Sequence, residues 1–132
     1  MEQAFVDTSA WYAFVNQQDP DHARIRKLFR TFQGRLLSSN YIFDETITLC
    51  LYRLGHAVAV KVGETLRNPA VVGLLQVTPE DDQKAWTLFL ERPDKMYSYT
   101  DCVSFTLMKK LHIEVAMALD EDFRQEGFRV VP

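Results

Sequence analysis

The feature that most constrains this chain is its alternation of short apolar runs with longer segments of helical periodicity. Runs of strand length occur at residues 3–6, 35–38, 71–77, 114–119 and 128–131. Between them, apolar residues recur with helical spacing, and a single helical turn is expected at residues 121–125. Strands that alternate with helices in this way predict an α/β fold built around a mainly parallel sheet.

Residues that cap or break helices mark the expected boundaries. Helices are predicted over residues 10–16, 22–32, 57–67, 79–90 and 101–111, and a short extended piece over residues 97–99. Thr8 or Ser9 is expected to cap the first helix. Ser39 or Asn40 is expected to cap a further helix that runs to Leu54 and stops before Gly55.

Length and composition favour one globular domain over residues 1–132 of this 132-residue chain. The start of the chain lacks the basic residues and the apolar core of a secretory signal, and no apolar run approaches membrane-span length. We therefore expect a cytoplasmic protein with no membrane partner, in which Cys50 and Cys102 are buried free thiols. The net charge of −3 argues against an indiscriminate nucleic-acid binder, but not against an enzyme that holds phosphates through a metal.

Three aspartates stand where predicted strands give way to helices. Asp7 follows the first apolar run, Asp120 follows the run at residues 114–119, and Asp101 opens a predicted helix. Ligands of open α/β sheets bind at the carboxyl ends of the strands, near a topological switch point. These positions predict a site, although an aspartate after a strand is also a common helix cap.

Glu45 lies on a helix that is apolar around most of its circumference, so its carboxylate needs a hydrogen-bond donor or a cation. If the four acids converge, each pair about 4 Å apart repels by roughly 4 kcal/mol at an effective dielectric of about 20. Neighbouring helix N-termini favour the ionised forms, so we expect a cation rather than protons. Oxygen ligands alone select Mg²⁺ or Mn²⁺.

Four ordered blocks resemble the PIN-domain family, specifically the VapC-type ribonuclease toxins of bacterial toxin–antitoxin pairs. They are Val6-Asp7-Thr8-Ser9-Ala10-Trp11, Asp44-Glu45-Thr46-Ile47-Thr48-Leu49 with Arg53-Leu54-Gly55, Ser98-Tyr99-Thr100-Asp101-Cys102-Val103-Ser104-Phe105, and residues 118–128 around Asp120. The blocks span nearly the whole chain, and only the ordered set is specific.

The resemblance implies a three-layer sandwich with a central, mainly parallel five-stranded sheet flanked by helices. It also implies an endoribonuclease with Mg²⁺ (or Mn²⁺) held by Asp7, Glu45, Asp101 and Asp120, with Asp122 replacing or assisting Asp120. Thr8, Ser9 and Ser104 match supporting positions, although capping and helix packing explain them equally well. Expected partners are an RNA substrate, a cognate antitoxin and a second copy in a homodimer.

Two other function classes stay open at this point. A haloacid-dehalogenase-like phosphatase would need a second acid two positions after Asp7, where the chain has Ser9. A non-cleaving PIN-like module that binds RNA or protein would need no metal. Basic residues at positions 24, 26, 27, 30, 35, 109 and 110 could follow a phosphate backbone, although solvated helix faces explain them better. Tyr41 and Tyr52 are expected to contact a protein partner.

Overall fold

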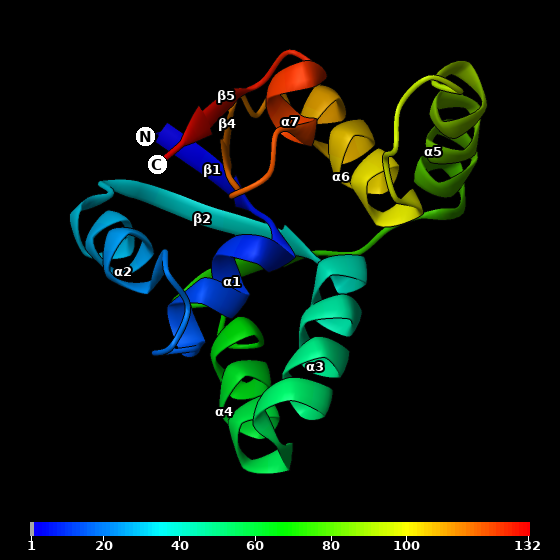
Figure 1. The fold of residues 1–132 in the computed structure, drawn as a ribbon. Helices are drawn as coiled ribbons and strands as arrows, with labels where there is room; N and C mark the ends of the chain where they lie inside the picture. Colours follow the sequence, from blue (N-terminus) through cyan, green and yellow to red (C-terminus); the bar gives the residue numbers. More distant parts are fainter. Residues whose placement is uncertain (1) are drawn as a thin grey trace.

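The computed structural model describes residues 2–132, which form five strands and seven helices (Figure 1). The strands are β1 (Glu2–Val6), β2 (Gly34–Ser39), β3 (Val72–Leu75), β4 (Val115–Met117) and β5 (Arg129–Val131). The helices are α1 (Thr8–Val15), α2 (His22–Thr31), α3 (Asn40–Leu54), α4 (His56–Leu66), α5 (Pro79–Glu91), α6 (Tyr99–Lys110) and α7 (Asp122–Gln125). The predicted alternation of strands and helices is confirmed.

The strands form one sheet in the order β3-β2-β1-β4-β5, and every neighbouring pair is parallel. The chain winds outward from β1 through β2 to β3, then crosses to β4 and β5 on the other side. Right-handed crossovers therefore place α1 to α4 on one face and α5 to α7 on the other, and Figure 1 shows the sheet between these two groups. The winding direction reverses between β1 and β4, which makes this point the topological switch.

Two predicted local features are wrong. Asp7, rather than Thr8 or Ser9, caps α1, because its backbone is extended (φ −82°, ψ 160°) and its carboxylate accepts the Ser9 N–H. The extended piece expected at residues 97–99 ends too late, because the Ser98 backbone is extended (φ −69°, ψ 164°) but Tyr99 is helical. Ser98 and Asp101 form a capping box instead, so Tyr99 already belongs to α6.

The core lies between the sheet and both helical layers, and Cys50 and Cys102 are buried free thiols within it, as predicted. Helix α3 is less buried than its composition suggests, because it packs against α1 and α4 but leaves Leu51 41% exposed. Within residues 2–132, none of the helices combines the length and the apolar character needed to cross a bilayer.

Candidate active site

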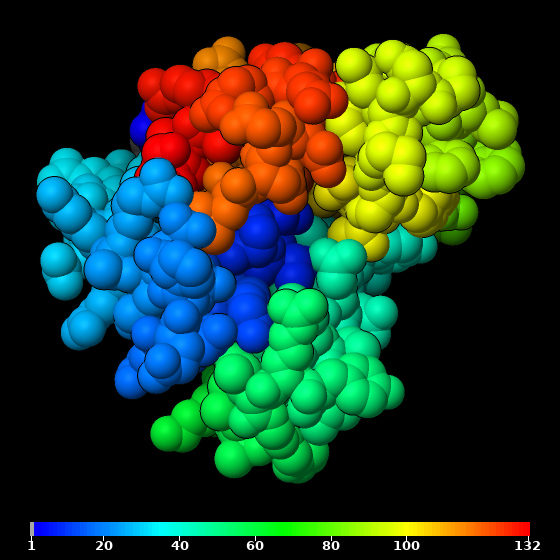
Figure 2. All heavy atoms as spheres, in the orientation of Figure 1, coloured from blue at the N-terminus to red at the C-terminus, as the bar shows by residue number. Residues whose placement is uncertain are grey.

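An open hollow of about 900 Å³ lies where β1 and β4 end, at the switch point of the sheet. Figure 2 views the molecule from the side on which the dark-blue start of α1 is recessed between the surrounding helices. We call it the acid-lined hollow because seven carboxylates line it: Asp7, Asp19, Asp44, Glu45, Asp101, Asp120 and Asp122.

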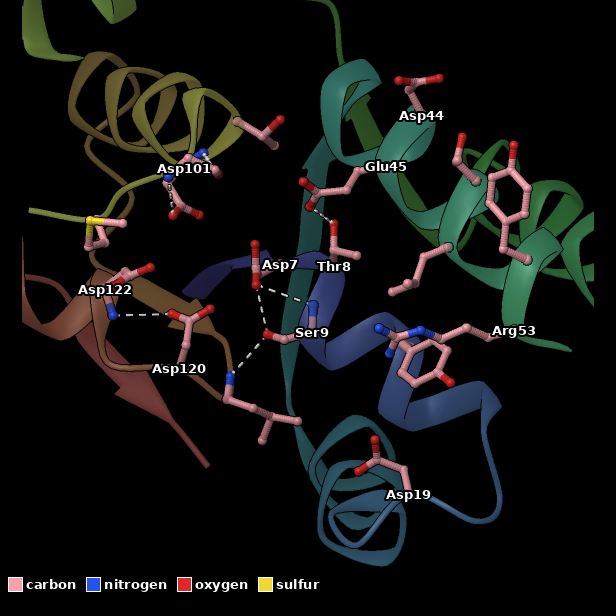
Figure 3. Close-up of a pocket in the computed structure, with 18 residues that line it drawn as sticks. Asp7, Thr8, Ser9, Asp19, Asp44, Glu45, Arg53, Asp101, Asp120 and Asp122 are labelled. Atoms are coloured by element: carbon pink, nitrogen blue, oxygen red, sulfur yellow. Dashed lines mark hydrogen bonds between the residues drawn. The ribbon is translucent and has the colours of Figure 1, made fainter.

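The acids singled out from the sequence all line this hollow, although they come from four separate segments. Figure 3 shows the carboxylates of Asp7, Asp101, Asp120 and Glu45 turned towards the same space. Within the described part of the chain, however, no three acidic, histidine or cysteine side chains are gathered closely enough to hold one metal ion. The acids share one hollow without forming a coordination sphere.

Asp7 is held where β1 passes into α1. Its N–H donates to the Met117 carbonyl at 3.0 Å, which extends the pairing of β1 with β4. Its Oδ2 accepts from the Ser9 N–H at 3.2 Å and from the Ser9 hydroxyl at 2.7 Å. The same hydroxyl accepts the Leu119 N–H at 3.1 Å, so Ser9 ties the end of β4 to the carboxylate of Asp7.

Glu45 reaches the hollow from the second turn of α3. Its Oε1 accepts a short hydrogen bond from the Thr8 hydroxyl, and that hydroxyl in turn accepts from Thr46 Oγ1 at 3.4 Å. Thr8 is buried and directly follows Asp7. Its hydrogen bond therefore holds the Glu45 carboxylate against the start of α1 (Figure 3).

Asp101 and Asp120 are also held through short-range hydrogen bonds. Asp101 Oδ2 accepts the Ser98 N–H at 3.0 Å within the capping box of α6. Asp120 Oδ1 accepts the Asp122 N–H at 3.1 Å, so Asp122 supports Asp120 through its backbone while its own carboxylate lines the hollow.

Each of the four acids thus commits one oxygen to a hydrogen-bond donor of the fold: Oδ2 of Asp7 and Asp101, Oδ1 of Asp120 and Oε1 of Glu45. The second oxygen accepts no hydrogen bond from an N–H or hydroxyl of residues 2–132. These acceptors are therefore free to take protons or a cation from the hollow.

Burial and mutual repulsion raise the proton affinity of three of these acids. Desolvation, with added repulsion from Asp120 and Glu45, raises the pKa of Asp7 to about 6 even though Ser9 hydrogen bonds oppose the shift. Desolvation, followed by repulsion from Asp7 and the proximity of Asp122, raises the pKa of Asp101 to about 8. Desolvation and the neighbouring acids also raise the pKa of Asp120. A divalent cation would relieve the same repulsion, so the donor set fits a hard ion.

Several predicted residues lie away from the hollow. The Ser104 hydroxyl is buried and donates to the Thr100 carbonyl at 3.0 Å, which is a packing role within α6. Lys109 pairs with Glu126 and Lys110 with Asp81, so these lysines join α6 to its neighbours. Arg24 pairs with Asp21, and none of the basic residues proposed from the sequence lines the hollow.

Sequence reasoning did not place Asp19, Asp44 or Arg53 at the site, although all three line the hollow, and Arg53 is the one that brings a positive charge. Arg53 lines it together with Thr48, Leu49 and Tyr52, all on α3 with Glu45. Relative to Glu45 these positions follow the i+3, i+4, i+7, i+8 spacing of one helix face. That periodicity, taken from Glu45 rather than from the apolar residues, would have placed Arg53 at the site.

Known proteins of similar sequence and structure share this arrangement of elements. A sequence profile of the PIN domain matches residues 4–128. The chain is 36% identical over 124 residues to the 23S rRNA-specific endonuclease VapC20 of Mycobacterium tuberculosis, covering 94% of each chain. It is 29% identical over 117 residues to a VapC ribonuclease of Archaeoglobus fulgidus, covering 85% of this chain and 74% of that protein. The crystal structure of Mycobacterium tuberculosis VapC20, described as a sarcin–ricin-loop-cleaving toxin, matches with a TM-score of 0.93 at 35% identity, covering 98% of this chain and 99% of that one.

Proposed function

The chain belongs to the PIN-domain family and is an endoribonuclease of the VapC toxin type, and we propose that it cuts RNA phosphodiesters in the acid-lined hollow. One observation carries this proposal: Asp7, Glu45, Asp101 and Asp120 come from distant segments and line one hollow at the switch point of the sheet. If these acids had only a structural role, their mutual repulsion would destabilise the fold with no compensating interaction.

PIN-domain nucleases depend in general on divalent metals, and we propose that Asp7, Glu45, Asp101 and Asp120 hold Mg²⁺ or Mn²⁺, assisted by Asp122. When bound, such an ion makes a water available as hydroxide and stabilises the charge that develops on the phosphate. Ser9 and Thr8 act as positioning residues, because their hydroxyls fix the carboxylates of Asp7 and Glu45. The same arrangement leaves the second oxygen of each carboxylate without a hydrogen-bond donor among residues 2–132, so that these oxygens could bind such an ion.

We further propose that the substrate is 23S rRNA, cut in its sarcin–ricin loop. The relative of known structure that carries this description matches this chain over 99% of its own length with a TM-score of 0.93, and this likeness supports a similar substrate. A hollow open to solvent suits an RNA loop, whose splayed nucleotides enter more readily than a continuous duplex.

VapC toxins pair with VapB antitoxins, and we propose that a cognate antitoxin covers the hollow of this chain and that the toxin forms a homodimer. Tyr52, which is 83% exposed at the rim of the hollow, suits a contact with RNA or antitoxin, whereas Tyr41 packs partly against the core. We expect the activity in the cytoplasm, where ribosomal RNA is found.

Cleavage assays with 23S and 16S rRNA test these proposals. We expect a discrete cut in 23S rRNA with Mg²⁺ or Mn²⁺, none in chelator, and a loss of at least a hundredfold in Asp101→Asn. Cutting that persists in both chelator and Asp101→Asn would come from a contaminant. Binding of RNA without any cutting would instead identify a non-cleaving module and refute the nuclease proposal.

A further inference from the structure

The acid-lined hollow carries a strong excess of negative charge, yet its proposed substrate is itself a polyanion. Among the described residues that line it, Arg53 is the one cation, set against seven carboxylates. A divalent ion offsets charge at the acids themselves, but the nucleotides on either side of the cut also bring phosphates into this field. These phosphates need a positive contact at the rim.

Arg53 is placed to supply that contact. The ion pairs within residues 2–132 do not include it, so its guanidinium is not neutralised by a neighbouring carboxylate. The guanidinium instead lies over the ring of Tyr12, 5.4 Å from its centroid. Figure 3 shows the Arg53 side chain running from α3 across to α1, beside the hollow.

Tyr12 places an aromatic ring beneath the Arg53 guanidinium. Its ring is half-buried at the rim, and its hydroxyl accepts from the Asn16 amide at 3.3 Å, which fixes the orientation of the ring. A guanidinium stacked on an aromatic face keeps its outer N–H groups free to donate to a phosphate. Tyr52, largely exposed on the same rim, adds a second aromatic face on which a base can stack.

From this geometry we infer that Arg53, stacked on Tyr12, binds a backbone phosphate of the RNA beside the scissile bond, with Tyr52 stacking on a neighbouring base. This rests on the proposed function, because it assumes that the RNA is cut in the acid-lined hollow. An acidic peptide would also suit a guanidinium, but two aromatic faces on the same rim favour a nucleic acid.

The chain offers a matched control for the charge and the stacking. The Arg67 guanidinium lies over the Phe43 ring, also 5.4 Å from its centroid, but neither residue lines the acid-lined hollow. Arg67→Gln therefore removes an equivalent cation–aromatic contact from another part of the surface. Tyr12→Phe keeps the ring and removes only the hydroxyl, whereas Tyr12→Leu removes the aromatic face.

Binding of a labelled 23S rRNA fragment containing the sarcin–ricin loop is measured by fluorescence anisotropy in chelator, where the wild type does not cut. We expect Arg53→Gln to weaken binding about tenfold, which corresponds to about 1.4 kcal/mol. The slope of log affinity against log salt should fall by about 0.7, as for one phosphate contact on a single strand. Arg53→Lys should recover part of the affinity, Tyr12→Leu should lose a few-fold, Tyr12→Phe should lose less than Tyr12→Leu, and Arg67→Gln should match the wild type.

In the cleavage reaction with metal, Arg53→Gln should raise KM about tenfold and leave kcat within twofold. Equal behaviour of Arg53→Gln and Arg67→Gln, alongside normal cutting by the wild type, would overturn this inference and leave the nuclease proposal intact. A wild type that cuts no RNA would overturn the proposed function instead. Loss of antitoxin binding with unchanged RNA binding would make the pair a protein contact and also overturn the inference.

Discussion

Replacing Asp7 by Asn removes one charge from the acid-lined hollow while keeping most of the local structure. Asn is as good a helix cap as Asp, and its side-chain oxygen can still accept from the Ser9 N–H and hydroxyl. The substitution therefore separates the electrostatic cost of the site from its role at the start of α1.

The expected effect follows from the pKa of Asp7. Burial, with repulsion from the neighbouring acids, raises it from 3.8 to about 6. At 1.36 kcal/mol per pH unit, an ionised Asp7 costs the folded state about 3 kcal/mol above pH 6. Because a buried amide also carries a desolvation cost, we expect Asp7→Asn to stabilise the metal-free protein by about 1–3 kcal/mol at pH 8. For a chain of this size that raises Tm by about 4–10 °C.

Thermal unfolding at pH 8 measures this effect, with and without Mn²⁺. In chelator, Asp7→Asn should melt above the wild type. With Mn²⁺ at about a hundred times its dissociation constant, the wild type should gain about 2.7 kcal/mol, whereas the variant should gain much less. Glu64→Gln serves as the control, since Glu64 is exposed on α4 and lies outside the hollow.

Two results would refute this reasoning. A metal-free Asp7→Asn that is less stable than the wild type would show that the Asp7 carboxylate is stabilised in the fold rather than strained by burial and repulsion. A full Mn²⁺ response in the variant would show that Asp7 is not a ligand. Neither result would follow from a changed cap alone, because the cap geometry is retained.

Three further outcomes are expected. In chelator, the wild type should lose unfolding free energy from pH 5 to pH 8, because Asp7 (pKa about 6) and Asp101 (pKa about 8) keep protons in the folded state that the unfolded chain has already released; urea titrations across this range measure the loss. Glu126→Gln should lower the urea-derived unfolding free energy by about 2 kcal/mol, because this carboxylate is only 4% exposed and bridges two cations. Gly55→Ala should lower it by about 1–2 kcal/mol, because φ is 96° at this position between α3 and α4.

The order of elements and most of their boundaries could be predicted from local signals. Strand-length apolar runs fix β1 and β2, and the Ser39 cap and Gly55 stop of α3 are the ones its sequence predicts. Helix ends are set mainly by the residues beside them, so a single sequence suffices for this level of structure.

Features that depend on distant partners could not be predicted in the same way. The run at residues 114–119 reads as one strand, yet β4 ends at Met117, because the Leu119 N–H bonds to the Ser9 hydroxyl instead of continuing the ladder. Likewise, the apolar stripe of α3 suggests full burial. Leu51 stays exposed because α1 and α4 cover only part of the helix, and how much they cover depends on how the whole fold packs.

The sequence alone predicted that these acids lie at the ends of strands, but it could not show that the acids converge. That Asp7 and Asp120 meet follows from β1 and β4 being neighbours, which is a fact of topology rather than of local sequence. Asp101 and Glu45 are brought in by the start of α6 and by α3, elements that follow other strands altogether.

An acid that caps a helix can also bind a metal, because capping uses only one of its two carboxylate oxygens. Asp7 and Asp101 each use Oδ2 at the start of a helix and keep Oδ1 free of donors within residues 2–132. The cap holds the carboxylate in place without a metal and offsets part of the repulsion that a cation would otherwise have to relieve alone. The fold can therefore gather negative charge before an ion binds, because Asp7 and Asp101 are each stabilised on one side by the start of a helix.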